Sequence, residues 1–229
     1  MIYLIPSLLA EDATETIPSY VLAAVRSCQV IFAENERTAR RFLRKMDPAI
    51  SIDQFEWFAI HKAEASQVAT LREKIRERKD IAIISEAGCP GIADPGQLLI
   101  AEAQRLQQPV RPLVGPSALL LALMASGLNG QHFVFHGYLP VDRGERVRRI
   151  RQIEEASRKE GSTRLFIETP YRNDRMLADI LEVCQEDTRV CIASQITSPD
   201  EWIVTRTVRE WRTNTPSLHK KPVIFLIQA

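Results

Sequence analysis

The sequence lacks several patterns that would assign it at once to a familiar class. Its four cysteines form no Cys-x-x-Cys pair, so neither a disulfide framework nor a structural metal site is expected. No apolar run approaches the ~20 residues of a membrane span. The first apolar segment leads into Glu11, Asp12 and Glu15 without a basic region, which argues against a signal peptide. We therefore expect a cytoplasmic protein with no membrane segment.

Further absences narrow the ligand chemistry. The chain contains neither the Gly-x-Gly-x-x-Gly fingerprint of dinucleotide-binding domains nor the Lys-Ser/Thr of a P-loop. His132 and His136 are four residues apart, but they flank Phe133-Val134-Phe135, which is typical of a strand rather than of a metal-binding helix. No bound metal is expected. Because the formal net charge is only +1, nucleic acid could be bound only by a local basic patch.

What the chain does contain is a repeated alternation of short apolar runs with helical segments. Its 229 residues, 45% of them hydrophobic, can form one large domain or two small ones. The strand–helix pattern restarts after Gly115, so we predict two α/β domains, 1–115 and 116–229. The first should hold a mainly parallel sheet and the second a mixed one. The last two strands, at 202–205 and 223–227, are expected to pair antiparallel.

The most informative stretch runs from Ile81 to Leu98. Ile81–Ser85 is a continuous apolar run typical of a strand buried on both faces. A Gly/Pro loop follows at Gly88–Gly91, and Asp94 and Pro95 are then expected to be the N-cap and first residue of a helix. The stretch is either an ordinary strand–helix turn or a loop whose backbone N–H groups bind a ligand at the carboxyl edge of a sheet.

Resemblance to a known family favours the ligand-binding interpretation. Residues 85–96, SEAGCPGIADPG, resemble the Ser-Asp-Ala-Gly-Thr-Pro-Gly-Ile-Ser-Asp-Pro-Gly loop of the tetrapyrrole methylase superfamily. The branch of greatest similarity contains the bacterial 16S rRNA ribose 2′-O-methyltransferases. Residues 137–140 and 168–172 also resemble that branch's Gly-Phe-Leu-Pro and Glu-Ser-Pro-His-Arg. The resemblance implies S-adenosylmethionine as methyl donor, held in a cleft between the two domains, and a homodimer, to which the apolar helix Ala118–Ala125 would contribute surface.

The resemblance also implies individual site residues. Those carried over as cofactor contacts are Leu9, Cys89, Ile92, Ala93, Ser117, Ala118, Ile167, Ala193, Lys221 and Pro222. The candidates for assisting methyl transfer to a hydroxyl are Glu168, Arg172 and Arg37, as a nearby base or cation.

Two polar segments each allow two interpretations. Glu34-Asn35-Glu36-Arg37 either caps the basic helix Thr38–Met46 or contacts substrate. Arg143–Arg151 is the most basic segment of the chain. It is either a solvated helix face or a contact for RNA phosphates.

The sequence departs from the family pattern at several places. The loop Pro6–Asp12 contains no glycine, and Ser194-Gln195 stands where Arg-Glu is usual. The chain also ends at Ala229, directly after the last expected strand, where the ribosomal enzymes usually continue. Three functions therefore remain open: methylation of ribosomal RNA, methylation of a tetrapyrrole or other small molecule, and a catalytically retired cofactor-binding or scaffolding role.

Overall fold

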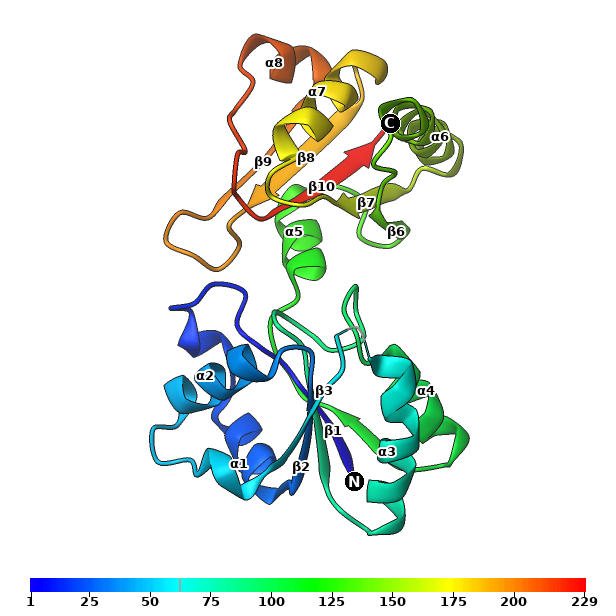
Figure 1. Ribbon diagram of the computed structural model, residues 1–229. Helices are drawn as coiled ribbons and strands as arrows, with labels where there is room; N and C mark the ends of the chain where they lie inside the picture. The colour runs from blue at the N-terminus through cyan, green and yellow to red at the C-terminus, as the bar shows by residue number, and fades with distance from the viewer. Residues whose placement is uncertain (62) are drawn as a thin grey trace. The chain divides into compact units, whose positions relative to one another are not determined.

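The computed structural model describes residues 1–61 and 63–229. The chain divides into two compact units, Met1–Ser117 and Ala118–Ala229, where the sequence placed a boundary after Gly115. Each unit contains its own five-stranded sheet (Figure 1). The α/β class and the division into one parallel and one mixed sheet are confirmed. Across the described residues, no helix combines the length and apolarity needed to cross a membrane.

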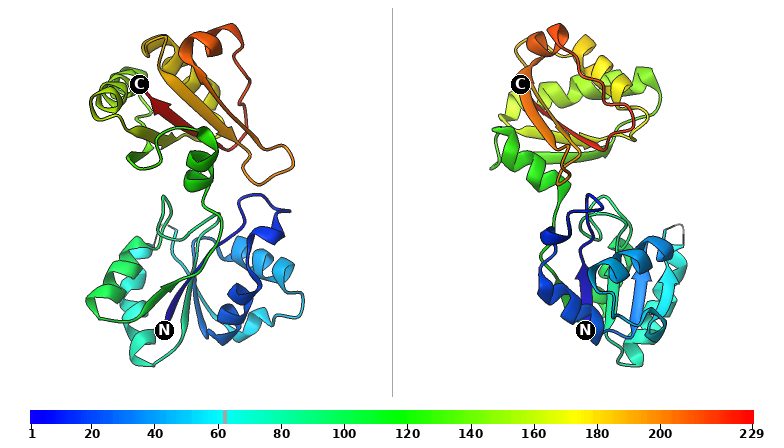
Figure 2. Two further views of the ribbon diagram at one scale, coloured as in Figure 1. Left: turned by 180° about the vertical axis from the view of Figure 1, so that it is seen from behind. Right: turned by 90° about the vertical axis from the view of Figure 1, so that its left-hand side faces the viewer.

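The first unit is a parallel sheet with helices on both faces. Its strands have the spatial order β3-β2-β4-β1-β5, and every neighbouring pair is parallel. The views agree that α1 and α2 cover one face and α3 and α4 the other (Figures 1 and 2). The strands are β1 (Ile2–Ile5), β2 (Val30–Ala33), β3 (Glu56–Ala59), β4 (Ile81–Ile84) and β5 (Val110–Pro112). The helices are α1 (Ser19–Ser27), α2 (Glu36–Met46), α3 (Glu64–Arg76) and α4 (Gln97–Arg105).

Alternating residues of the central strands fill the two cores of this unit. On β2, Ile31 packs with α1 and α2, whereas Phe32 packs with α3 and α4. On β4, Ile84 and Ile83 divide in the same way. Since successive side chains of a strand point to opposite faces, a strand covered on both sides must be apolar at every position. This is why Ile81–Ile84 reads as a continuous apolar run.

The second unit is a mixed sheet with the order β6-β7-β10-β8-β9. β6 and β7 are parallel, while β10 runs antiparallel to β7 and β8. The expected pairing of the last two strands is wrong, because β9 pairs with β8 and β10 lies between β7 and β8. The strands are β6 (Phe133–Tyr138), β7 (Thr163–Ile167), β8 (Arg189–Ser194), β9 (Trp202–Thr207) and β10 (Val223–Gln228). The helices are α5 (Ala118–Ser126), α6 (Arg143–Glu160), α7 (Asn173–Val183) and α8 (Val208–Thr213).

The core of the second unit forms where this sheet meets α6, α7 and α8. Phe166 of β7 stacks on Phe225 of β10, with their ring centroids 5.7 Å apart. Trp211 of α8 is buried in the same cluster, and its indole N–H donates to the carbonyl of Val190 at 2.8 Å. The helix α5 packs against β8, β9 and β10. The sheet is therefore anchored around its central strand, β10.

Candidate functional site

The loops that carry the candidate residues of the first unit meet at the carboxyl edge of its sheet. β4, β1 and β5 are neighbours and parallel, so the loops that follow them emerge together. Ser7 and Gly88 form a bridge between two of these loops, with N···O distances of 2.8 and 3.2 Å. The Ser7 hydroxyl also donates to the carbonyl of Ser85 at 2.8 Å. The loop without glycine is thus tied directly to the central loop.

The central loop follows a tight path that depends on backbone in the left-handed region. Gly88 has φ +70°, and a Cβ placed there would lie 3.3 Å from Leu9 Cδ2 and 3.5 Å from the Pro116 carbonyl oxygen. The Cys89 thiol donates to that same carbonyl oxygen at 3.5 Å. The predicted residues Leu9 and Cys89 and the segment leading to Ser117 are therefore brought together around Gly88.

Ala93 has φ +63°, a conformation that non-glycine residues adopt rarely and at a cost of about 1–2 kcal/mol. Both Ala93 and its neighbour Ile92 are exposed. Within the described residues, the backbone amides of Cys89 and Ala93 donate to no protein acceptor. Strained residues and unused amides of this kind are typical of ligand-binding loops.

The prediction that Asp94 caps the following helix is wrong. The helix α4 begins at Gln97, and its N-cap is Gly96 at φ +118° without a side-chain cap of its own. The cap comes instead from Glu64 of α3. Its Oε1 accepts from the amides of Gly96, Leu98 and Leu99 at 2.9, 2.7 and 3.4 Å. A carboxylate here also complements the positive end of the helix dipole.

Relieved of the capping role, Asp94 lies near two other acids. Glu34 is buried, and its Oε2 accepts from the Glu86 amide at 2.9 Å. The Glu86 carboxylate accepts from the Thr38 hydroxyl at 3.0 Å. Burial, followed by the charges of Glu34 and Glu86, raises the pKa of Asp94 to about 7. Asp94 was not among the predicted catalytic residues, and only the tertiary arrangement of these acids distinguishes it.

Of the two interpretations of the segment Glu34–Arg37, the helix cap is confirmed. The Asn35 Oδ1 accepts from the amides of Arg37 and Thr38 at 3.1 and 3.3 Å, so Asn35 caps α2. Glu34, by contrast, holds the central loop through the Glu86 amide. The Arg37 side chain is exposed and forms no ion pair with any described residue. Its role toward substrate stays a prediction.

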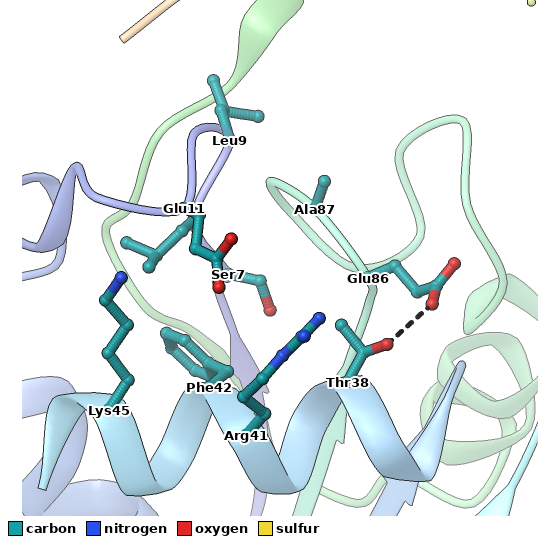
Figure 3. Close-up of a pocket in the computed structure, with 10 residues that line it drawn as sticks. Ser7, Leu9, Glu11, Thr38, Arg41, Phe42, Lys45, Glu86 and Ala87 are labelled. Carbon is teal, nitrogen blue, oxygen red and sulfur yellow. Dashed lines mark hydrogen bonds between the residues drawn. The ribbon is translucent and has the colours of Figure 1, made fainter. Parts of the chain in front are cut away.

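A cavity of about 200 Å³ lies beside these loops, within the first unit. Figure 3 shows Arg41 extending from α2 toward Ser7 and Glu86, and Lys45 rising beside Glu11. The sequence had marked the helix as basic but had not singled out its cavity-facing side chains. The lining residues are Ser7, Leu8, Leu9, Glu11, Thr38, Arg41, Phe42, Lys45, Glu86 and Ala87.

The candidate residues of the second unit also lie at one edge of their sheet. Ile224 of β10 pairs with Ile167 on one side and with Ala193 on the other. The carbonyl of Pro222, directly before β10, accepts from the Gln195 amide at 3.0 Å. The strand register thus brings Ile167, Ala193, Lys221 and Pro222 together. Ala193 is fully buried, whereas Ile167 and Lys221 are half-buried and Pro222 is exposed.

Two buried polar side chains lie at this edge and were missed from the sequence. Asn173, the first residue of α7, is fully buried, and its Nδ2 donates to the Lys221 carbonyl at 2.7 Å. Its Oδ1 has no partner among the described residues. The Ser194 hydroxyl is likewise buried without a partner there. Unsatisfied buried polar atoms are uncommon.

Glu168 and Arg172 satisfy one another. The buried Glu168 Oε1 accepts from Arg172 Nη2 at 2.6 Å and Nε at 3.0 Å, and from the Thr169 amide at 2.6 Å. This pairing explains how a carboxylate can be buried at the end of β7. It joins the end of the strand to the start of α7. A part for either residue in methyl transfer stays a prediction.

The basic segment Arg143–Arg151 is partly committed to the fold. Arg143 contacts both Asp179 and Glu182 of α7, at 3.1 and 2.7 Å. Arg146 is buried against Asp179 at 2.6 Å. The remaining three arginines, 148, 149 and 151, are exposed.

Arg149 lies 3.3 Å from the His136 Nδ1. Burial, with Arg149 and Arg164 nearby, lowers the pKa of His136 to about 4. The imidazole is therefore neutral at pH 7, and its Nδ1 can accept from the Arg149 guanidinium.

Comparison with known proteins agrees with this architecture. Residues 12–211 match the family model for tetrapyrrole (corrin/porphyrin) methylases. The ribosomal RNA small subunit methyltransferase I of Vibrio cholerae is 29% identical over 99% of this chain and 76% of its own length. That of Haemophilus influenzae is 32% identical over 75% of this chain but only 61% of its own length.

Solved structures extend the agreement to the fold. The uroporphyrin-III C-methyl transferase of Thermus thermophilus, solved with S-adenosyl homocysteine, aligns over 99% of this chain and 96% of its own. The TM-score is 0.58, at 14% sequence identity. Together with the family match over residues 12–211, these findings place the chain in the tetrapyrrole (corrin/porphyrin) methylase family.

Proposed function

We propose that this chain is an S-adenosylmethionine-dependent methyltransferase that modifies a ribose 2′-hydroxyl of small-subunit ribosomal RNA, in the cytoplasm. The observation that carries the proposal is the similarity to the Vibrio cholerae small-subunit RNA methyltransferase along 99% of the chain. Preservation of the glycine-containing central loop supports a working cofactor site, in spite of the departures at Pro6–Asp12 and Ser194-Gln195.

The central loop of the first unit fits the cofactor. Gly88 has φ +70°, a conformation that side-chain-bearing residues rarely adopt, and Leu9 and Pro116 approach it closely. Ala93 is held in the left-handed region. The amides of Ala93 and Cys89 donate to no described protein acceptor, so both can donate to a ligand. Cys89, Ile92 and Ala93 would therefore contact the cofactor through backbone and small side chains, and Leu9 and Ser117 would flank them.

The edge of the second unit fits as well. The Asn173 Oδ1 and Ser194 Oγ are buried beside this edge without a partner among the described residues, and a buried water, or a polar ligand reaching them after a local opening, would satisfy them. Ile167, Ala118, Lys221 and Pro222 would provide the surrounding contacts. Ala193 would act only by positioning its neighbours, since its side chain is fully buried.

When bound, S-adenosylmethionine supplies an electrophilic methyl group on a sulfonium sulfur. The chain must align the acceptor hydroxyl and take up its proton. With its pKa near 7, Asp94 can accept that proton close to neutral pH. Arg37 is exposed and can offer positive charge. Arg172 uses its Nε and Nη2 to bind Glu168, so it would act on substrate through its remaining N–H groups.

We further propose that the chain forms a homodimer. Two apolar residues of the short helix α5, Leu120 and Met124, are 52% and 78% exposed. A second copy of the chain would cover this apolar surface. Light scattering at micromolar concentration tests this point. A monomer there would contradict it.

The function is tested by incubating the purified protein with tritiated S-adenosylmethionine and either small ribosomal subunits lacking modification or uroporphyrinogen III. Label in RNA that resists alkaline hydrolysis, assigned to a 2′-O-methyl nucleoside by mass spectrometry, is the expected result. Label in the tetrapyrrole alone would refute the choice of substrate. Failure to bind S-adenosylmethionine in calorimetry would refute the enzyme proposal and favour a retired scaffold.

A further inference from the structure

The helix α2 presents the most one-sided charge of the first unit. It carries five basic residues against a single acid, Glu36. Arg37, Arg41 and Arg44 are spaced at i, i+4 and i+7, which places them within about 60° of one another around the helix and along about 10 Å of its axis. The opposite side packs into the core through Phe42 and Leu43. These three arginines therefore form one exposed stripe, called here the α2 stripe.

The fold makes no use of the α2 stripe. All three arginines are exposed, and no described residue forms an ion pair with any of them. The other two basic residues of α2 are engaged, since Arg40 pairs with Glu36 at 2.7 Å and stacks on Trp57, and Lys45 pairs with Asp12 at 2.8 Å. Adjacent like charges repel along a helix. Three unpaired arginines along one side of the helix therefore lower the stability of the fold slightly. A bound anion would offset this repulsion, which suggests that the stripe binds a ligand.

The segment Arg143–Arg151 of α6, for which the sequence left an RNA contact open, is partly used by the fold. Two of its five arginines are tied to Asp179, and Arg146 is buried. Arg149 faces His136. Arg148, Arg149 and Arg151 remain exposed, so the free charge of the two segments is similar, and the feature that distinguishes α2 is the cavity beside its free arginines.

The α2 stripe also adjoins the cavity at the carboxyl edge of the sheet. Arg41 belongs to the stripe and lines the cavity at the same time, across from Ser7 and Glu86 (Figure 3). A strand whose phosphates follow the stripe would pass the mouth of a cavity of about 200 Å³, lined partly by the apolar Leu8, Leu9 and Phe42. A nucleotide at that point would lie beside the central loop.

We propose that Arg37, Arg41 and Arg44 of α2 bind the phosphate backbone of the substrate RNA and direct a nucleotide into the adjoining cavity. This inference rests on the proposed function, because it names the surface by which that function's substrate is held. Arginine suits the role because its planar guanidinium can make paired hydrogen bonds to phosphate oxygens. The contacts are independent of base sequence, so they supply affinity and register rather than specificity.

The test compares three triple variants of the full chain with the unmodified protein. The first replaces Arg37, Arg41 and Arg44 by glutamine, and the second replaces Arg148, Arg149 and Arg151 of α6. The third is a matched control of equal charge change in the first unit, in which Arg76, Arg78 and Lys79 are replaced by glutamine. These residues are the last residue of α3 and two that follow it, at the opposite edge of the sheet. Binding of a fluorescein-labelled single-stranded RNA is followed by anisotropy between about 50 and about 300 mM salt. Thermal melts and calorimetry with S-adenosylmethionine accompany each variant.

We expect the α2 variant to bind RNA at least about tenfold more weakly at low salt, with the slope of log K against log salt reduced by about 2. Its melting temperature and cofactor affinity should match those of the unmodified protein. Equal losses in the α2 and control variants, or a larger loss in the α6 variant, would overturn the inference while leaving the proposed function intact. Cofactor binding without any RNA binding by the unmodified protein would overturn both.

Discussion

Replacing Asp94 by asparagine should stabilise the first unit above neutral pH and have little effect in acid. Burial, followed by the charges of Glu34 and Glu86, raises the pKa of the Asp94 carboxyl from its ordinary value of 3.8 to about 7. Between these two values the folded state binds more protons than the unfolded state. The free energy of unfolding therefore falls as the pH rises through this window. Asparagine keeps the shape of the side chain but cannot ionise.

The magnitude follows from the shift. About three pH units correspond to about 4 kcal/mol, an upper bound for a fully buried group. Because Asp94 is partly accessible to solvent, water screens the repulsion, and we expect a gain of about 1–2 kcal/mol at pH 8 relative to pH 5. The assay is urea denaturation of both proteins at each pH, with hydrogen exchange of β4 peptides to assign the change to the first unit.

A matched control is Glu155→Gln, which removes an exposed acid on α6 and should shift stability similarly at both pH values. The reasoning would be refuted if the Asp94 variant had the same stability as the unmodified protein at pH 5 and at pH 8. Because asparagine caps helices about as well as aspartate does, that result would be compatible with the capping role that the sequence had suggested for Asp94.

Three further changes test other parts of the structure. Ala93→Trp should abolish S-adenosylmethionine binding in calorimetry, because the large side chain would fill the space at the loop. Ala93→Gly should keep binding and raise the free energy of unfolding by about 1 kcal/mol, because glycine adopts the left-handed backbone without strain. Normal affinity in the Trp variant would mean that the cofactor site lies elsewhere. Glu64→Ala should lower the free energy of unfolding by about 2 kcal/mol, since three amides at the start of α4 lose their acceptor. The hydrogen exchange of these amides should accelerate, and unchanged exchange would contradict the cap. Arg146→Met should cost about 3 kcal/mol in a urea melt by leaving Asp179 buried with less compensation. Adding Asp179→Leu should recover most of that loss, and a double variant as unstable as the single one would show that packing rather than charge is at stake.

Much of the fold could be predicted from the sequence because its causes are local. An apolar run such as Ile81–Ile84 indicates a strand covered on both faces, since each side chain must meet a helix. The capping of α2 by Asn35 involves residues two and three positions away. The central loop is recognisable because Gly88, Gly91 and Gly96 stand where the backbone has a positive φ, a conformation that glycine adopts at little cost.

Other features were decided only when distant parts of the chain met. β10 enters the sheet between β7 and β8, and no local pattern specifies which two strands a final apolar run will join. Glu64 caps a helix that begins 33 residues later, which leaves Asp94 free to be held near Glu34 and Glu86. Asp179 engages Arg143 and Arg146 from another helix, and so only part of the segment that is most basic in sequence keeps its charge available. Composition determines how many charges a chain has, but burial and pairing across the fold determine which of them remain for a ligand.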